Sequence, residues 1–124
     1  MNDGEERIHS YSRADAIADG VLVDVTETAK EAGITYPTAL TSAVFESYVR
    51  VPPGVEAQDE PGRLWDILWM LRLAIARASS CDSLRFTVLV HNDNHAPQAV
   101  ELKALCHPGD DAEPVITILL INED

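Results

Sequence analysis

The segment His91-Asn92-Asp93-Asn94-His95 places two histidines four residues apart with a carboxylate between them. Imidazole and carboxylate groups bind transition metals and exchange protons near neutral pH. Two histidines at this spacing chelate a metal well on a helix, where both project from one face. Here the flanking residues alternate between apolar and polar, which is typical of strands. Asn and Asp favour turns because their side chains bond to the nearby backbone. We therefore expect a hairpin turn and no metal, with a small enzyme or metal-binding protein using His91 and His95 as one alternative.

Other catalytic patterns are weaker still. Cys106 and His107 are adjacent in a predicted strand, so their side chains should point to opposite faces of a sheet. Asp110, Asp111 and Glu113 could hold a divalent cation, but Pro-Gly-Asp-Asp is an ordinary turn sequence. The chain contains no G-x-S-x-G elbow and no glycine-rich phosphate-binding motif. The sequence predicts a protein that is not an enzyme and needs no cofactor.

The most strongly patterned element is residues 61–78, where apolar side chains cover most of a helix circumference. The clearly polar positions form a narrow stripe of Arg63, Asp66 and Arg77. A helix of this kind is expected in the middle of a fold. If Trp65 and Trp69 are buried there, removing either should cost about 3–5 kcal/mol.

Strand periodicity follows this helix. Residues 84–91, 100–107 and 114–121 alternate or are continuously apolar, and Asn, Asp, Gly and Pro fill the connections. The predicted fold is α+β, with N-terminal helices and one long central helix packed on a C-terminal three-stranded antiparallel β-meander.

We expect residues 1–11 to be a flexible N-terminus and residues 12–124 to form a single domain. Ser12 and Thr26 are expected to cap helices, and Gly20 and Gly33 to end them. The first part of the domain should contain a helix, a short strand and two more helices: residues 12–20, 21–25, 26–33 and 37–50.

The charge is the least ordinary property of the chain. Asp and Glu number 21 against 9 Lys and Arg, so the formal net charge is −12. Such a protein repels nucleic acid and anionic membranes and attracts basic partners. Clustered carboxylates resemble a run of phosphates and could occupy the basic channel of a nucleic-acid-binding protein. The candidate partner-binding residues are Asp15, Asp19, Glu27, Glu31, Glu56, Asp59, Glu60, Asp110, Asp111 and Glu113. The alternative is a solvated surface with acids placed favourably at helix starts.

The sequence also bears on location and association. The first ten residues are polar and acidic, unlike a secretory signal, and the apolar run 115–121 is far shorter than the roughly 20 residues of a membrane span. We expect a cytoplasmic protein, in which Cys81 and Cys106 remain reduced. Leu89 and Leu105 on the outer sheet face could form the seam of a homodimer.

Residues 14–44, 51–76 and 101–124 resemble a family of small uncharacterised proteins encoded on bacterial plasmids, integrative elements and phages. The resemblance is most specific at Gly62-Arg63-Leu64-Trp65-Asp66 and in residues 108–117. It implies a mobile-element setting, in which small acidic proteins often inhibit host defences. Our leading hypothesis is an anti-CRISPR-like or antirestriction-like protein that binds the basic surface of a host nucleic-acid-handling complex, such as a CRISPR effector, without contacting nucleic acid. The alternative is a homodimeric accessory or regulatory protein of plasmid maintenance.

Overall fold

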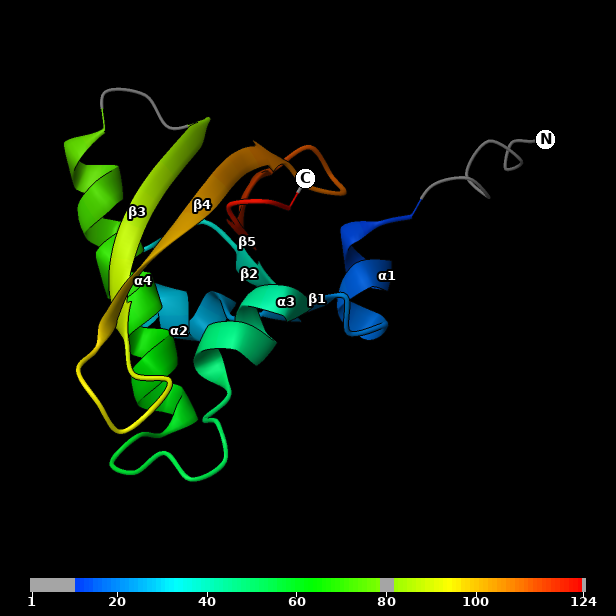
Figure 1. The fold of residues 1–124 in the computed structure, drawn as a ribbon. Coiled ribbons are helices and arrows are strands. Elements are labelled where there is room, and N and C mark those ends of the chain that lie inside the picture. The colour runs from blue at the N-terminus through cyan, green and yellow to red at the C-terminus, as the bar shows by residue number, and fades with distance from the viewer. Residues whose placement is uncertain (1–10, 79–81, 124) are drawn as a thin grey trace.

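The computed structural model describes residues 11–78 and 82–123 and confirms the α+β class (Figure 1). The expectation for the N-terminal segment falls on residues 1–10, which lie outside the described part of the chain, as does Cys81. The elements follow in the order α1 (Arg13–Ala18), β1 (Leu22–Asp24), α2 (Thr26–Glu31), β2 (Thr38–Thr41), α3 (Ser42–Val44), the π-helix η2 (Phe45–Val49), α4 (Glu60–Arg77), β3 (Ser83–Val90), β4 (Gln98–Pro108) and β5 (Pro114–Leu120).

The three predicted C-terminal strands do form an antiparallel meander, β3-β4-β5, but the prediction that they make up the whole sheet is wrong, because β1 and β2 extend it to a five-stranded mixed sheet. The strand order is β1-β2-β5-β4-β3, and β2 pairs with β5 in parallel while the other neighbours are antiparallel. Residues 115–119 of β5 are all buried. A continuously apolar strand belongs in the interior of a sheet rather than at its edge, and β1 and β2 supply the neighbours that place β5 there.

The predicted helix over residues 37–50 is only partly confirmed: residues 42–49 are helical, but the start of the predicted helix is wrong. Thr38–Thr41 forms β2, and the amide of Ile116 donates to the carbonyl of Pro37 at 2.8 Å where the parallel ladder begins. The Thr41 hydroxyl accepts from the amide of Val44 at 3.2 Å, so helical structure starts only after the strand. Pairing with β1 and β5 overrides the local helical pattern, since β-branched threonines suit a strand.

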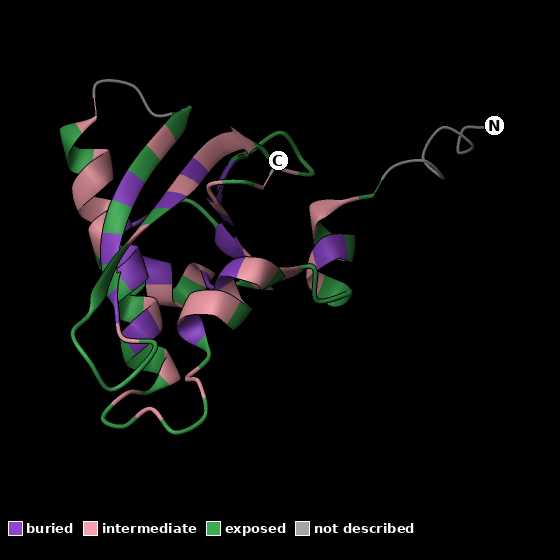
Figure 2. Cartoon of the chain, in the orientation of Figure 1, coloured by how far each residue is buried: buried purple, intermediate pink, exposed green. Residues whose placement is uncertain are grey.

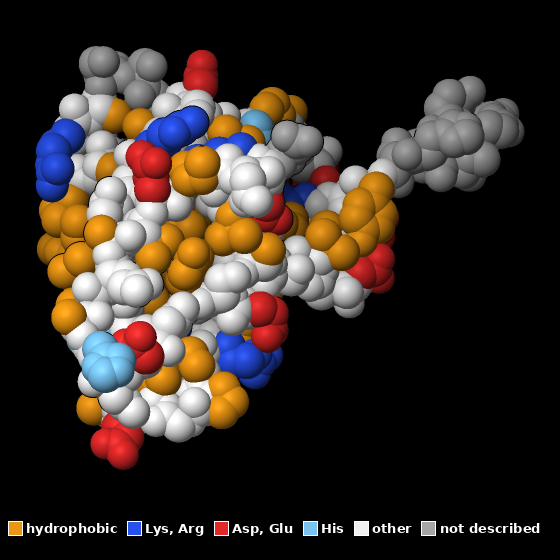
Figure 3. Space-filling model, viewed as in Figure 1, with side chains coloured by type: hydrophobic (Ala, Val, Ile, Leu, Met, Phe, Trp, Pro, Cys, Tyr) orange, Lys and Arg blue, Asp and Glu red, His pale blue; other side chains and the backbone are white. Residues whose placement is uncertain are grey.

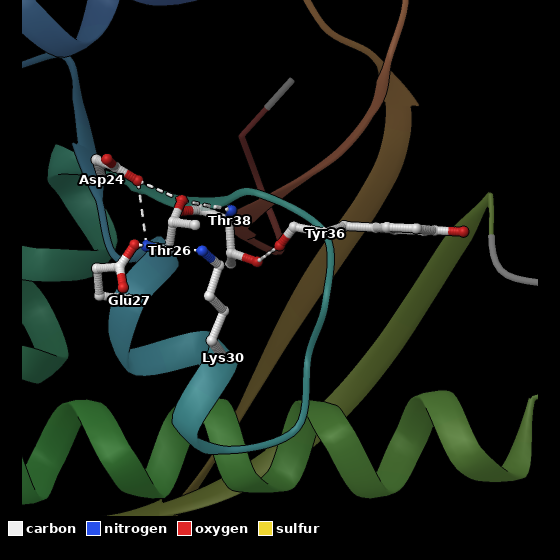
Figure 4. Close-up of polar contacts among 6 residues, drawn as sticks. All are labelled: Asp24, Thr26, Glu27, Lys30, Tyr36 and Thr38. Atoms are coloured by element: carbon white, nitrogen blue, oxygen red, sulfur yellow. Dashed lines mark hydrogen bonds and ion pairs between the residues drawn. The ribbon is translucent and has the colours of Figure 1, made fainter.

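The expected helix ends are mostly confirmed. Ser12 and Asp15 form a capping box at the start of α1, and Gly33, with φ of 95°, follows α2. Thr26 does not cap α2 as predicted, because Val25 is the residue at the N-cap position. The Thr26 hydroxyl instead donates to the Asp24 carboxylate at 2.5 Å and accepts from the amide of Thr38 at 3.1 Å (Figure 4). Thr26 therefore joins α2 to β2.

The main core lies between the sheet and the helices α2, α3, η2 and α4 (Figure 2). Its fully buried side chains include Leu40, Leu68, Leu71, Leu102 and Ile118. The helix α4 packs chiefly on β3 and buries one face there. Its predicted place in the middle of the fold is wrong, because Trp65 and Trp69 are 37% and 42% exposed.

A smaller packed region lies on the other face of the sheet. The short helix α1 packs beside β1 and buries Ala16, and the Arg13 guanidinium reaches across to β5. No helix in the described residues is long and apolar enough to cross a bilayer.

Candidate functional site

The His91–His95 segment forms the exposed turn between β3 and β4, as predicted. The Asn92 amide donates to the carbonyl of Ser47 at 3.0 Å. The Asn94 side chain accepts from the amide of Glu56 and donates to the carbonyl of Gly54, both at 2.9 Å. These asparagines fasten the turn to the loop that precedes α4, which is a structural role.

Arg63 anchors the same region and was not recognised from the sequence. It belongs to the predicted polar stripe of α4, yet the structure leaves it only 4% exposed. Its Nε donates to the carbonyl of Val49 at 3.1 Å, and Nη1 and Nη2 donate to the carbonyl of His91 and to Asn92 Oδ1. Burial lowers the pKa of Arg63. A guanidinium can be buried here because its fork of donors satisfies three separate oxygens.

The surroundings of His91 offer little room for chemistry. Burial raises the pKa of Asp66, while the nearby charges of His91 and Arg63 act to lower it. The cavity beside these residues measures about 10 Å³, which is close to the minimum for one water molecule. Among residues 11–78 and 82–123, no group of three or more His, Cys, Asp and Glu side chains is arranged to hold a metal.

His107 lies far from His91 and His95 along the strand ladder. The β3–β4 and β4–β5 turns are at opposite ends of the antiparallel strand β4. The His107 ring contacts the carbonyl of Pro108 at 3.0 Å and the hydroxyl of Thr117 at 2.9 Å. The structure therefore keeps apart the residues that a shared histidine site would need.

Three of the candidate acids in the middle of the chain, Glu27, Asp59 and Glu60, serve local structure. Asp59 caps α4 by accepting from the amide of Gly62 at 2.7 Å. Glu60 lies 3.7 Å from Arg50, and Glu27 lies 3.4 Å from Lys30. Glu31 and Glu56 are exposed.

Two acidic groups that are distant in sequence meet at one end of the molecule. The Asp110 carboxylate accepts from the amides of Arg13 and Ala14 at 2.8 and 3.0 Å, so the β4–β5 turn sits on the first residues of α1. This contact gathers carboxylates of α1, β1 and the turn, and Asp24 is a member that sequence reasoning missed. We call this group the acidic end: Asp15, Asp19, Asp24, Asp110, Asp111 and Glu113.

Hydrogen bonds and charges connect the members of the acidic end. The Tyr11 hydroxyl donates to Asp19 at 2.8 Å, and this bond, with the charges of Asp19 and Asp15, raises the pKa of Tyr11. Burial lowers the pKa of Arg13, and Asp24, Asp110 and Glu113 act in the opposite direction.

The Arg13 guanidinium is turned inward. It donates to the Thr117 hydroxyl at 2.7 Å and to the carbonyl of Ile116 at 2.8 Å, on β5. The six carboxylates of the acidic end belong to exposed residues, and Arg13 lies close enough to Asp24, Asp110 and Glu113 to feel their charges.

The remaining acids do not join the acidic end. In the view of Figure 3, acidic side chains lie singly or in small groups among hydrophobic and basic ones. The loop that carries Glu56 and Asp59 lies at the bottom of the view in Figure 1, away from α1. The ten candidate acids thus form one joined group and several separate ones.

A second feature that the sequence did not predict lies along α4. The rings of Trp65 and Trp69 stack with centroids 6.0 Å apart, and the Arg72 guanidinium lies 6.0 Å from the Trp69 ring. Arg72 also lines a cavity of about 370 Å³ between α4, the segment after α2 and the sheet. The sequence did contain a sign of this feature: α4 has more apolar residues than can be buried on one packed face, so some of them must remain partly exposed.

Comparison with known proteins identifies one protein family that covers the whole chain. Residues 1–124 match the model of a family of unknown function (DUF6573). No curated protein and no solved structure matches the chain.

Proposed function

We propose that this chain, which belongs to the family of unknown function DUF6573, is a non-enzymatic protein that binds a basic surface of a host nucleic-acid-handling complex. The observation that carries the proposal is the acidic end, where the contact of Asp110 with α1 joins carboxylates from both ends of the chain. The partner class is a CRISPR effector or a restriction complex, in line with the mobile-element setting that the sequence resemblance implies.

The geometry supports binding because several of these carboxylates are held in place. Asp15 is fixed by the capping box, Asp19 by Tyr11, and Asp110 by two backbone amides. Carboxylates that are already ordered lose little side-chain entropy when a partner binds. A negative surface of this kind accelerates association with a basic groove. Its carboxylates also displace the counterions of that groove, as the phosphates of a nucleic acid would.

The test compares two double variants that each remove two negative charges. Asp19→Asn with Asp111→Asn alters the acidic end, and the side-chain carbonyl introduced at position 19 can still accept from the Tyr11 hydroxyl. Glu31→Gln with Glu56→Gln is the matched control on exposed positions elsewhere. Purified protein would be used for affinity capture from lysates of bacteria that carry CRISPR–Cas or restriction systems, at low and high salt, followed by a phage-plaque assay.

We expect the wild-type protein to capture a nucleic-acid-binding complex at low salt and to protect phage from the defence system. The acidic-end variant should lose capture severalfold, mainly through slower association, while the control retains it. Capture of no such complex at low salt, or equal losses in both variants, would contradict the proposal.

A homodimeric accessory protein is the second candidate. The register places Leu89 opposite Ala99 and Leu105 opposite Ser83, so the two leucines lie about 20 Å apart along the ladder. They do not make one patch, but β3 is an edge strand of the sheet and could pair with a second copy. Sedimentation equilibrium that shows a salt-resistant dimer would favour this candidate, and a monomer at all concentrations would remove it.

A further inference from the structure

We propose that the cavity beside α4 binds a small amphipathic carboxylate, with its apolar body inside the cavity and its carboxylate on Arg72. The cavity contains no residue of the acidic end, so this inference is independent of the function proposed above.

The size and lining of the cavity select an apolar body. Its volume of about 370 Å³ falls in the range of small-molecule sites, roughly 300–1,000 Å³. It has room for about twelve groups of the size of a water molecule. Its apolar lining comes from α4, the sheet and the segment after α2: Ile34, Leu71, Ile75, Leu84, Ala104 and Ile116.

Arg72 determines the sign of the charge that the ligand should carry. Among the described residues that line the cavity, Arg72 is the only Lys or Arg, and none is Asp or Glu. Arg72 forms no salt bridge with any residue that the structure describes. A guanidinium binds a carboxylate through two parallel hydrogen bonds, so the cavity favours an anion in a protein whose net charge is −12.

The position of Arg72 is defined by its neighbours. A Cβ atom built on Gly33 would lie 2.5 Å from Arg72 Nε, so the side chain passes directly over this glycine. Gly33 has φ of 95°, a conformation that suits glycine and ends α2. The Arg72 guanidinium also lies over the Trp69 ring. These contacts hold the guanidinium at the wall of the cavity before any ligand arrives.

Tyr36 completes the wall from the segment after α2. Its carbonyl accepts from the Thr38 hydroxyl at 2.9 Å, which fixes the backbone. Figure 4 shows the Tyr36 ring pointing away from this network, and the residue is part of the cavity lining. The ring thus adds a flat apolar surface for the body of the ligand.

The first test measures binding of defined probes by calorimetry and by NMR titration. Decanoate and indole-3-propionate carry a carboxylate on an aliphatic or an aromatic body, and decanol is the neutral counterpart of decanoate. We expect at least one acid to bind and decanol to bind more weakly. Arg72→Gln should weaken acid binding by about tenfold or more, since hydrogen bonds to charged groups contribute at this level. Arg77→Gln, which removes the same charge from an exposed position on the same helix, should leave binding unchanged.

A second variant tests the cavity itself. Ala76 is exposed and lies in the cavity lining, so Ala76→Trp should block entry without disturbing the core. Loss of acid binding in Ala76→Trp, with an unchanged circular dichroism spectrum and melting temperature, would support the site. The proposal is overturned if neither acid binds at millimolar concentration, if decanol binds as tightly as decanoate, or if Arg72→Gln and Arg77→Gln have equal effects.

Discussion

Arg63 Nη2 donates to Asn92 Oδ1 at 2.6 Å, which ties the first turn of α4 to the turn between β3 and β4. The same guanidinium holds the carbonyls of Val49 and His91. Replacing Arg63 with Met should lower the free energy of unfolding by about 2–5 kcal/mol, because one buried and two partly buried hydrogen bonds are lost. Urea denaturation measures the change. Arg77→Met is the matched control on the exposed side of α4 and should stay within about 0.5 kcal/mol of wild type, and equal effects would contradict the role of Arg63.

Asn94 connects the turn to the loop before α4 through the amide of Glu56 and the carbonyl of Gly54. We expect Asn94→Ala to destabilise the protein by about 1 kcal/mol and to speed hydrogen exchange at the Glu56 amide. Exchange measured by mass spectrometry or NMR tests this expectation. The neighbouring substitution His95→Ala removes an exposed side chain and should leave exchange at Glu56 unchanged. Similar exchange in all three proteins would show that the Asn94 contacts are dispensable.

Asp110 makes the free energy of unfolding depend on pH. The backbone amides of Arg13 and Ala14 donate to its carboxylate and lower its pKa below the ordinary value of 3.8. A carboxyl whose pKa is depressed by folding stabilises the native state above its unfolded pKa, and this contribution is lost as the pH falls through the folded value. Asp110→Asn should therefore be less stable than wild type at neutral pH, and the difference should shrink below about pH 4. Urea titrations between about pH 2 and pH 7 provide the measurement, and a constant difference across this range would contradict the assignment.

Trp69 contributes less to stability than its size suggests. Because it is 42% exposed, Trp69→Ala should cost about 1–2 kcal/mol rather than the roughly 3–5 kcal/mol of a buried tryptophan. Its neighbour Leu68 is fully buried, so Leu68→Ala should cost about 2–5 kcal/mol. Thermal unfolding of the two variants gives the comparison. A larger loss in Trp69→Ala than in Leu68→Ala would indicate that the tryptophan is packed more fully than the structure shows.

The sequence by itself determined those structural elements that depend only on residues close to one another along the chain. The capping box of Ser12 and Asp15, the end of α2 at Gly33 and the turn at His91–His95 depend on residues within a few positions of one another. The extent of α4 and the alternation in β3 also follow from short-range periodicity.

Tertiary structure alone decided the features that join distant segments. Thr38–Thr41 became a strand because β1 and β5 provided partners on both sides, and no local pattern specifies a partner as far along the chain as β5. Arg63 is buried because oxygens from two other segments converge on it. The acidic end exists because Asp110 reaches Arg13 and Ala14 across most of the chain. Sequence periodicity shows which residues share a face of one element, whereas contact between elements depends on how the whole chain packs.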